Sequence, residues 1–269
     1  MFWVRLRSGI ILMVIAIALL VLGGNILFAA MLVISLVGMM ELYRALKIHR
    51  TPLAAVGYAA AVGYYVLVYL DLTEFALAGA IAALVLLMAV YVFSFPKYHG
   101  DQVMAAFFGI FYVAVMMSFI YQTRMIENGK FLVWLIFASS WGCDTCAYCV
   151  GMLIGKHKMA PVLSPKKSVE GGIGGIVGAA LIGVIFTLVF REHITIFAYP
   201  VVSVAVLCAV CAAISQVGDL AASAIKRNHE IKDYGTLIPG HGGILDRFDS
   251  VIFTAPIVYY LILIFQQVG

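Results

Sequence analysis

Residues 75–95 read FALAGAIAALVLLMAVYVFSF, a stretch without a charged side chain. A helix needs about 20 mainly apolar residues to cross the hydrocarbon core of a bilayer, and this run is long enough. Comparable runs recur along the chain, in which 64% of the 269 residues are hydrophobic and only 11% are charged. Continuous runs also argue against a β-barrel, whose strands alternate over short segments. The sequence therefore predicts an all-α, polytopic integral membrane protein.

The apolar runs predict about nine transmembrane helices in a single membrane domain, residues 1–269. We expect residues 1–130 to form N-terminal spans, and residues 131–269 to hold the spans and cytoplasmic loops that carry the chemistry. The first two spans are short and fit either a tight hairpin or two half-inserted helices. The N-terminal run imitates a secretory signal but lacks a convincing small-residue cleavage site, so we expect it to be retained. The predicted spans are 9–22, 25–40, 53–70, 75–95, 103–121, 131–154, 172–190, 195–218 and 250–266.

The distribution of Lys and Arg predicts the orientation. With the N-terminus in the cytoplasm, fourteen of these residues fall on the cytoplasmic side and three on the other, a strong positive-inside bias. An odd number of spans then leaves Gly269 on the far side. We expect a protein of the cytoplasmic (inner) membrane with a cytoplasmic N-terminus. The fourteen are Arg5, Arg7, Arg44, Lys47, Arg50, Lys97, Lys156, Lys158, Lys166, Lys167, Lys226, Arg227, Lys232 and Arg247; the three are Arg124, Lys130 and Arg191.

The five cysteines, Cys143, Cys146, Cys149, Cys208 and Cys211, all lie in apolar segments. Their odd number and membrane setting argue against a disulfide framework. The C-x-x-C-x-x-C spacing of the first three is open to a metal or cluster interpretation. Thiolates are costly in a dry segment, however, so we expect small apolar side chains that pack helices. No basic patch with interleaved aromatics indicates a nucleic-acid partner.

Asp144 lies inside the predicted span 131–154. If residues 144 to 156 are helical, Asp144 is about 18 Å along the axis from the basic loop that follows. A carboxylate at that depth is costly unless it faces a wet or paired environment. Two interpretations follow: a structural polar contact with Tyr148 one turn on, or a carboxylate lining a cavity that opens to the cytoplasm.

The end of the predicted eighth span carries four polar side chains on one helical face. Asp219, Ser223, Lys226 and Arg227 follow an i, i+4, i+7, i+8 pattern. An acid, a hydroxyl and two cations on one stripe can bind a metal and a phosphate side by side. Cations also settle at helix C-termini and near lipid head groups. That alternative accounts for Lys226 and Arg227 but leaves Asp219 unexplained.

Residues 226–249, KRNHEIKDYGTLIPGHGGILDRFD, hold eight of the 30 charged residues. Their Gly-rich turn, residues 239–243, permits backbone conformations whose N–H groups converge on an anion. Asp246 and Asp249 are three apart, so a helical start places both on one side. Paired carboxylates beside basic residues suit Mg²⁺ that carries phosphates. A Gly-rich turn also commonly connects two helices, but the combination with acids and bases favours a site. His241 is a candidate phosphate donor or proton carrier.

The loop SPKKS at residues 164–168, followed by Glu170-Gly171-Gly172, offers further phosphate donors. Its alternative role is a positively charged anchor on anionic lipid head groups. Together, the residues indicate metal-assisted phosphoryl or nucleotidyl transfer at the cytoplasmic face of a membrane.

These residues resemble the signature of phosphatidate cytidylyltransferases, also called CDP-diacylglycerol synthases. The resemblance has no departure over the 27 positions 223–249. Asp144-Thr145-x-Ala147-Tyr148 and the loop 164–171 resemble further family motifs, with Ser168 where threonine is usual. Length and multi-span architecture agree, so the resemblance covers the whole chain. The matching positions are Ser223-x-Ile225-Lys226-Arg227, Lys232-Asp233, Gly235, Ile238-Pro239, His241-Gly242-Gly243-Ile244 and Asp246-Arg247-Phe248-Asp249.

The resemblance implies transfer of the cytidylyl group of CTP to phosphatidic acid, giving CDP-diacylglycerol and pyrophosphate for phospholipid biosynthesis. It implies a requirement for Mg²⁺, leaves a second cation open, and is compatible with a homodimer. Both reactants are anions, so metal ions and cationic side chains must neutralise charge and hold an in-line geometry.

We assign the roles within this resemblance as follows. Asp219 and Asp246 are the principal metal ligands, and Asp144, Ser223 and Asp249 are further ligands or support them. Asp144, Asp219, Asp246, Lys226 and Arg227 form the catalytic set. Ser164, Lys166 and Lys167 form a mobile loop that closes over CTP or receives phosphatidate. The remaining substrate-binding residues are Ser223, Lys232, His241, Gly242, Gly243 and Arg247.

Three alternatives remain open at this stage. A CTP-dependent polyprenol or phytol kinase, or a CDP-synthase acting on ether lipids, would share the CTP site but differ in acceptor. A cation transporter would use Asp144 and Asp219 along an ion path. A purely structural membrane protein leaves the charge concentrated in residues 226–249 unexplained.

Overall fold

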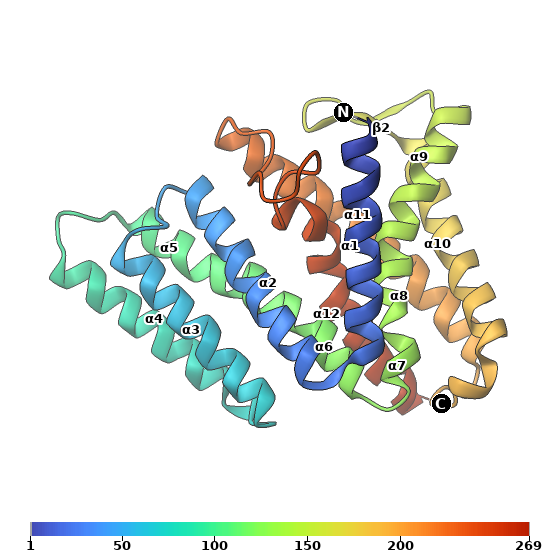
Figure 1. Cartoon of the computed structure of the whole chain (residues 1–269), viewed down its shortest axis with the longest axis horizontal. Coiled ribbons are helices and arrows are strands. Elements are labelled where there is room, and N and C mark those ends of the chain that lie inside the picture. Colours follow the sequence, from blue (N-terminus) through green and yellow to red (C-terminus); the bar gives the residue numbers. More distant parts are fainter. Residues whose placement is uncertain (1, 269) are drawn as a thin grey trace. The chain divides into compact units, whose positions relative to one another are not determined.

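The computed structural model describes residues 2–268 and is almost entirely helical (Figure 1). Seven of its helical segments are long and apolar enough to cross a membrane, which makes the chain an integral membrane protein. The count of nine spans and the cytoplasmic N-terminus stay predictions, and Gly269 lies outside the described residues. The seven segments are Gly24–Ala45, Pro52–Tyr69, Thr73–Phe93, Gly100–Met125, Val169–Val189, Pro200–Asn228 and Leu245–Gln267.

The described chain divides into two compact units. The first unit comprises the residues up to Ser118 together with His229–Arg247. The second comprises Phe119–Asn228 and the residues from Phe248 onward. The signature of residues 223–249 is therefore shared between the two units. The expected organisation, a single membrane domain with N-terminal spans in residues 1–130 and catalytic spans in residues 131–269, stays a prediction.

The first unit is built from consecutive helices whose ends follow local chemistry. Gly23 and Gly24 have φ angles of 61° and 52°, a left-handed conformation that favours glycine, and they separate the first two helices. Thr51 caps the third helix because its side-chain oxygen accepts from the Ala54 amide at 3.3 Å. The third and fourth helices lie side by side (Figure 1). The elements are α1 (Phe2–Leu22), α2 (Gly24–Ala45), α3 (Pro52–Tyr69), η1 (Thr73–Phe75), α4 (Ala76–Phe93), α5 (Gly100–Gly109) and the π-helix η2 (Ile110–Val115).

The second unit contains the predicted span 131–154, which is not one continuous α-helix. It consists of the short helices α7 (Gly129–Leu132) and α8 (Trp134–Phe137), the π-helix η3 (Ala138–Gly142) and α9 (Cys143–Ile154). A π-turn inserts an extra residue into the helical ladder and is frequent at functional sites. Here it ends at Gly142, two residues before Asp144. The other elements are α6 (Met116–Met125, which begins in the first unit), β1 (Lys158–Ala160), β2 (Ser164–Ser168), α10 (Val169–Val189), η4 (Arg191–His193), α11 (Pro200–Asn228) and α12 (Leu245–Val268, whose first turn belongs to the first unit).

Helices α9 and α10 pack closely because glycines face the contact. A Cβ atom on Gly171 would lie 2.7 Å from the carbonyl oxygen of Ala147, a distance that no side chain tolerates. Ser168 caps α10 by accepting from the Gly171 amide at 3.2 Å. The glycines after the SPKKS loop therefore serve helix packing.

All five cysteines are free thiols. Cys143, Cys208 and Cys211 are buried, and Cys143 belongs to a core cluster with Ala179 and Ala212.

Candidate active site

A cavity of about 510 Å³ in the second unit is lined by residues that lie far apart in the sequence. The β1–β2 hairpin and the helices α9, α10 and α11 contribute its walls. Tyr148, the alternative structural partner of Asp144, also lines the cavity. The structure thus places an acid of α9, an acid of α11 and the SPKKS loop around one space. The predicted site residues that line it are Asp144, Ser164, Lys166, Lys167 and Asp219.

Lys167 and Asp219 form an ion pair across this cavity, through Nζ and Oδ2. Each side chain is 24% exposed, so the pair is largely shielded from water. Such shielding strengthens the attraction relative to a surface pair. The lysine of the loop is thus held against the carboxylate that the sequence singled out as a metal ligand.

A third carboxylate approaches the same region from α12. Asp249 lies within electrostatic range of Asp219, Lys226 and Asp144. Three aspartates from three helices are therefore gathered with Lys167 and Lys226 among them. Ser223 and Arg227 lie on the same helix as Asp219, α11, which continues unbroken to Asn228.

Carboxylate and hydroxyl oxygens are the donors that Mg²⁺ prefers, so the chemistry of this set fits the predicted cation. Within residues 2–268, no three His, Cys, Asp or Glu side chains are placed as ligands of one ion. In this arrangement, Lys167 supplies the positive charge next to Asp219. The predicted metal ligands stay a prediction.

The SPKKS stretch, expected to be a mobile loop, forms strand β2 of an antiparallel hairpin with β1, in which Lys158 pairs with Ser168 and Ala160 with Ser164. Glu170 anchors the base of this hairpin. Its carboxylate accepts from the backbone amides of Lys156 at 3.1 Å and His157 at 3.2 Å, and contacts His157 Nδ1 at 2.5 Å. The hairpin that carries Lys166 and Lys167 is thereby tied to the start of α10.

Gln216 is a cavity residue that the sequence analysis missed. Its Nε2 atom donates to the carbonyl oxygen of Gly172 at 3.0 Å, and its side chain is buried. A hydrogen bond of this kind fixes α10 against α11 at the cavity wall. The available signal was an amide side chain within the otherwise apolar part of the span, three residues before Asp219.

In the first unit, Asp246 organises the Gly-rich turn of the signature. Its Oδ2 atom accepts from the backbone amides of Tyr234 at 2.8 Å and Gly243 at 3.0 Å, and the residue is only 5% exposed. Gly242 has a φ of 86° and leaves no room for a side chain, since a Cβ would lie 2.9 Å from the same carboxylate oxygen. The predicted turn is thus closed around Asp246.

Glu41, at the end of α2, holds the same segment and was also missed. Its oxygens accept from the amides of Ile244 at 3.0 Å and Leu245 at 2.8 Å, where α12 begins. Glu41 is 2% exposed. Cβ atoms on Gly235 or Gly243 would lie 2.4 Å from its carboxylate, so both glycines are needed for this approach. An acid at the end of an apolar run was the only sequence signal.

The other signature residues of the first unit occupy more open positions. His241 Nδ1 lies 3.0 Å from Ser8 Oγ, which donates to the Pro239 carbonyl at 2.9 Å. Lys232 is exposed and Arg247 is half-buried. The convergence of Asp246 with Asp144 and Asp219 stays a prediction.

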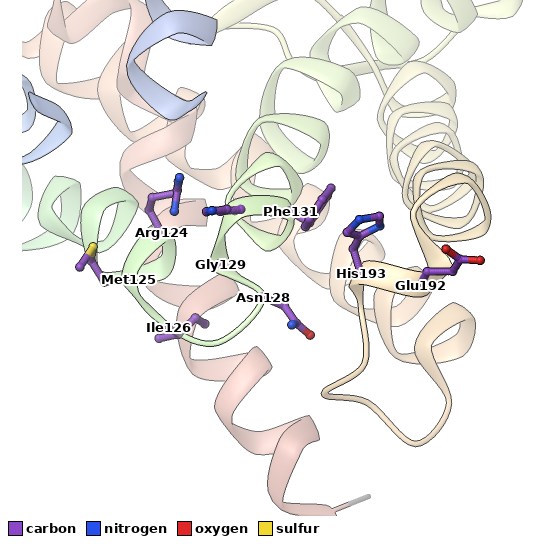
Figure 2. A pocket seen from close by; sticks show the side chains of 9 residues that line it. Arg124, Met125, Ile126, Asn128, Gly129, Phe131, Glu192 and His193 are labelled. Atoms are coloured by element: carbon purple, nitrogen blue, oxygen red, sulfur yellow. The ribbon is translucent and has the colours of Figure 1, made fainter. Parts of the chain in front are cut away.

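A second cavity of the second unit, about 500 Å³, contains none of the predicted site residues (Figure 2). It lies after the C-terminus of α10, next to Glu192 and His193, whereas the first cavity lies at the N-terminus of that helix. The two are therefore separated by 21 helical residues, or about 30 Å. Arg124 and Lys130, two of the three cations predicted on the far side, line it.

The chain belongs to the cytidylyltransferase family, whose sequence pattern matches residues 3–265. Its curated relatives include proteins named phosphatidate cytidylyltransferase. The one from Staphylococcus epidermidis is 31% identical over 264 residues, and the one from Staphylococcus saprophyticus is 29% identical over 265 residues. Each alignment covers 97% of this chain and 98% of the relative. The Bacillus subtilis protein is 35% identical over 188 residues, which is 70% of this chain and 68% of the relative.

Proposed function

We propose that this protein transfers the cytidylyl group of CTP to phosphatidic acid, forming CDP-diacylglycerol and pyrophosphate. The gathering of Asp144, Asp219, Lys166 and Lys167 around one cavity carries the proposal, in a chain of the cytidylyltransferase family. Near-full-length relatives named phosphatidate cytidylyltransferase support this acceptor.

In the proposed reaction, an oxygen of the lipid phosphate forms a bond to the α-phosphorus of CTP. The bond between the α-phosphorus and the bridging oxygen breaks, and pyrophosphate leaves with that electron pair. The lipid phosphate is itself the nucleophile, so no side chain forms a covalent intermediate. Lys166 and Lys167 bind the anionic reactants. When CTP enters, the ion pair of Lys167 with Asp219 is replaced by an ion pair of Lys167 with a phosphate oxygen.

The aspartates give the site its second task, which is to hold a cation beside the triphosphate. Asp219 and Asp246 would be its main ligands, with Asp144, Ser223 and Asp249 as the other candidates. A bound Mg²⁺ supplies neutralisation of phosphate charge. Lys226, Arg227, Lys232 and Arg247 bind the remaining phosphate oxygens, and the side chain of His241 is a further candidate phosphate donor.

We also propose that the cavity faces the cytoplasm, where CTP is available, because fourteen of seventeen Lys and Arg then lie on that side. The membrane is the cytoplasmic membrane. A homodimer, with which the resemblance is compatible, is also part of this proposal.

The test uses purified protein, phosphatidic acid vesicles, Mg²⁺, and CTP labelled either at the α- or at the γ-phosphorus. Label from the α-position should enter the lipid with equal release of pyrophosphate. Transfer of the γ-label with release of CDP identifies a kinase and contradicts the proposal. An ether lipid or a polyprenol in place of phosphatidic acid separates the remaining acceptors.

A further inference from the structure

The first unit has a groove of about 880 Å³ between α2 and α3, which lie side by side (Figure 1). Its α2 wall consists of residues spaced three or four apart, so they share one face of that helix. Two arginines and a histidine occupy one end. None of the residues assigned to cytidylyl transfer lines it. The apolar wall is formed by Val33, Leu36, Val37 and Met40 of α2 and by Ala59 and Val62 of α3.

The groove has the length of one membrane leaflet. From Val33 to Arg44, α2 rises about 16 Å, which is close to half of a hydrocarbon core about 30 Å thick. Both walls belong to segments long and apolar enough to cross a membrane. The apolar part therefore fits a hydrocarbon chain that runs parallel to α2.

The cationic end is formed by Arg44, His49 and Arg50. Both arginines are exposed, and neither makes a salt bridge within the described residues. Arg44 is within electrostatic range of Glu41, but the oxygens of Glu41 already accept from two backbone amides of α12. The guanidinium groups thus remain available to a further anion.

We propose that this groove binds one anionic glycerophospholipid. Its phosphate lies at Arg44 and Arg50, because guanidinium groups bind phosphate oxygens in pairs. Its acyl chain lies along α2 and α3. The chemistry of the two ends, cationic and apolar, selects a lipid over a second copy of the chain. The proposal rests on the groove alone and does not depend on the reaction assigned above.

Native mass spectrometry of the detergent-purified protein provides the test, with dioleoyl phosphatidic acid, phosphatidylglycerol and phosphatidylcholine as separate probes. Each arginine near an anionic head group contributes a factor of about five in affinity. Arg44→Gln/Arg50→Gln should therefore bind the two anionic lipids about 25-fold more weakly than wild type. Ala59→Phe should also lower binding because the ring fills the acyl path.

Two matched controls separate this site from general surface effects. Lys97→Gln removes an exposed cation that neither lines the groove nor neighbours its arginines in the sequence, and should bind like wild type. Ala78→Phe places the same ring on an exposed position of α4 and should also leave binding unchanged. Higher retention of phosphatidic acid than phosphatidylglycerol identifies a phosphomonoester preference, and equal retention a general phosphate site. Equal binding of phosphatidylcholine, no effect of the arginine and Ala59 variants, or a dimer joined through the groove overturns the proposal.

Discussion

Replacing Glu41 by glutamine tests how the signature turn is held in place. Glu41 accepts from the first amides of α12, at 3.0 and 2.8 Å, and packs against Gly235 and Gly243. In Glu41→Gln, one oxygen acceptor becomes an NH₂ group that faces an N–H donor. The substitution also removes a negative charge from a helix N-terminus, where it is favourable. Because Asp246 follows in the same turn, its position should become less fixed.

The size of the effect follows from the two hydrogen bonds. A hydrogen bond to a charged group contributes about 1.5–3 kcal/mol, so the loss of one and the weakening of the other cost about 3 kcal/mol. That energy corresponds to a factor of about a hundred in the population of the ordered turn. We therefore expect cytidylyl transfer by Glu41→Gln to fall by up to about a hundredfold.

The assay measures incorporation of α-labelled CTP into lipid, with thermal unfolding of the same preparations to confirm that the membrane helices are intact. Glu74→Gln is the matched control, since Glu74 is exposed in η1. It should keep wild-type turnover. Wild-type turnover by Glu41→Gln at all CTP concentrations would refute the positioning role of Glu41.

Three further substitutions probe the second unit. Gly171→Ala places a Cβ 2.7 Å from a backbone carbonyl of α9 and should lower stability by about 1–3 kcal/mol, measured as a lower thermal transition. Gly63→Ala is the control, since its Cβ meets open space and should leave the transition unchanged. Gln216→Leu removes the side-chain hydrogen bond to a carbonyl of α10 and should lower the transition by about 0.5–1.5 kcal/mol; an unchanged transition contradicts that bond. Lys167→Gln should raise the KM for CTP about tenfold or more by loss of a charge-assisted phosphate contact, and an unchanged KM would separate the hairpin from CTP binding.

The sequence predicted the parts of the fold that depend on local composition. The predicted spans 75–95 and 195–218 largely coincide with long apolar helices, although α11 begins at Pro200, because length and apolarity favour membrane insertion. The common face of Asp219, Ser223, Lys226 and Arg227 on α11 was also predictable, because these residues follow helical spacing. The interruption of the span 131–154 by a π-helix was not predictable, because no Pro marks it in the sequence.

Two residues that line the cavity, Asp144 and Asp219, could be singled out because each carboxylate stands out against apolar neighbours in the sequence. Glu41 was not, since its partners, Ile244 and Leu245, lie about 200 residues away in the sequence and are apolar residues that contribute only backbone amides. The hairpin that carries Lys166 also escaped prediction, because its strands are only 3 and 5 residues long and its Glu170 anchor lies outside them.

The most direct test of the account is a double-substitution measurement on Asp219 and Asp246. Asparagine keeps a side-chain oxygen, so the amides of Tyr234 and Gly243 retain their acceptor at position 246. Turnover of phosphatidic acid with saturating CTP and Mg²⁺ is compared for wild type, both single variants and the double variant, with Asp101→Asn as an exposed control.

Residues that act as one unit give strongly non-additive losses. The account predicts that Asp219→Asn and Asp246→Asn each lower turnover at least about a hundredfold, and that the double variant is little worse than either. Near wild-type turnover in either single variant, or losses that multiply in the double variant, would contradict a shared centre.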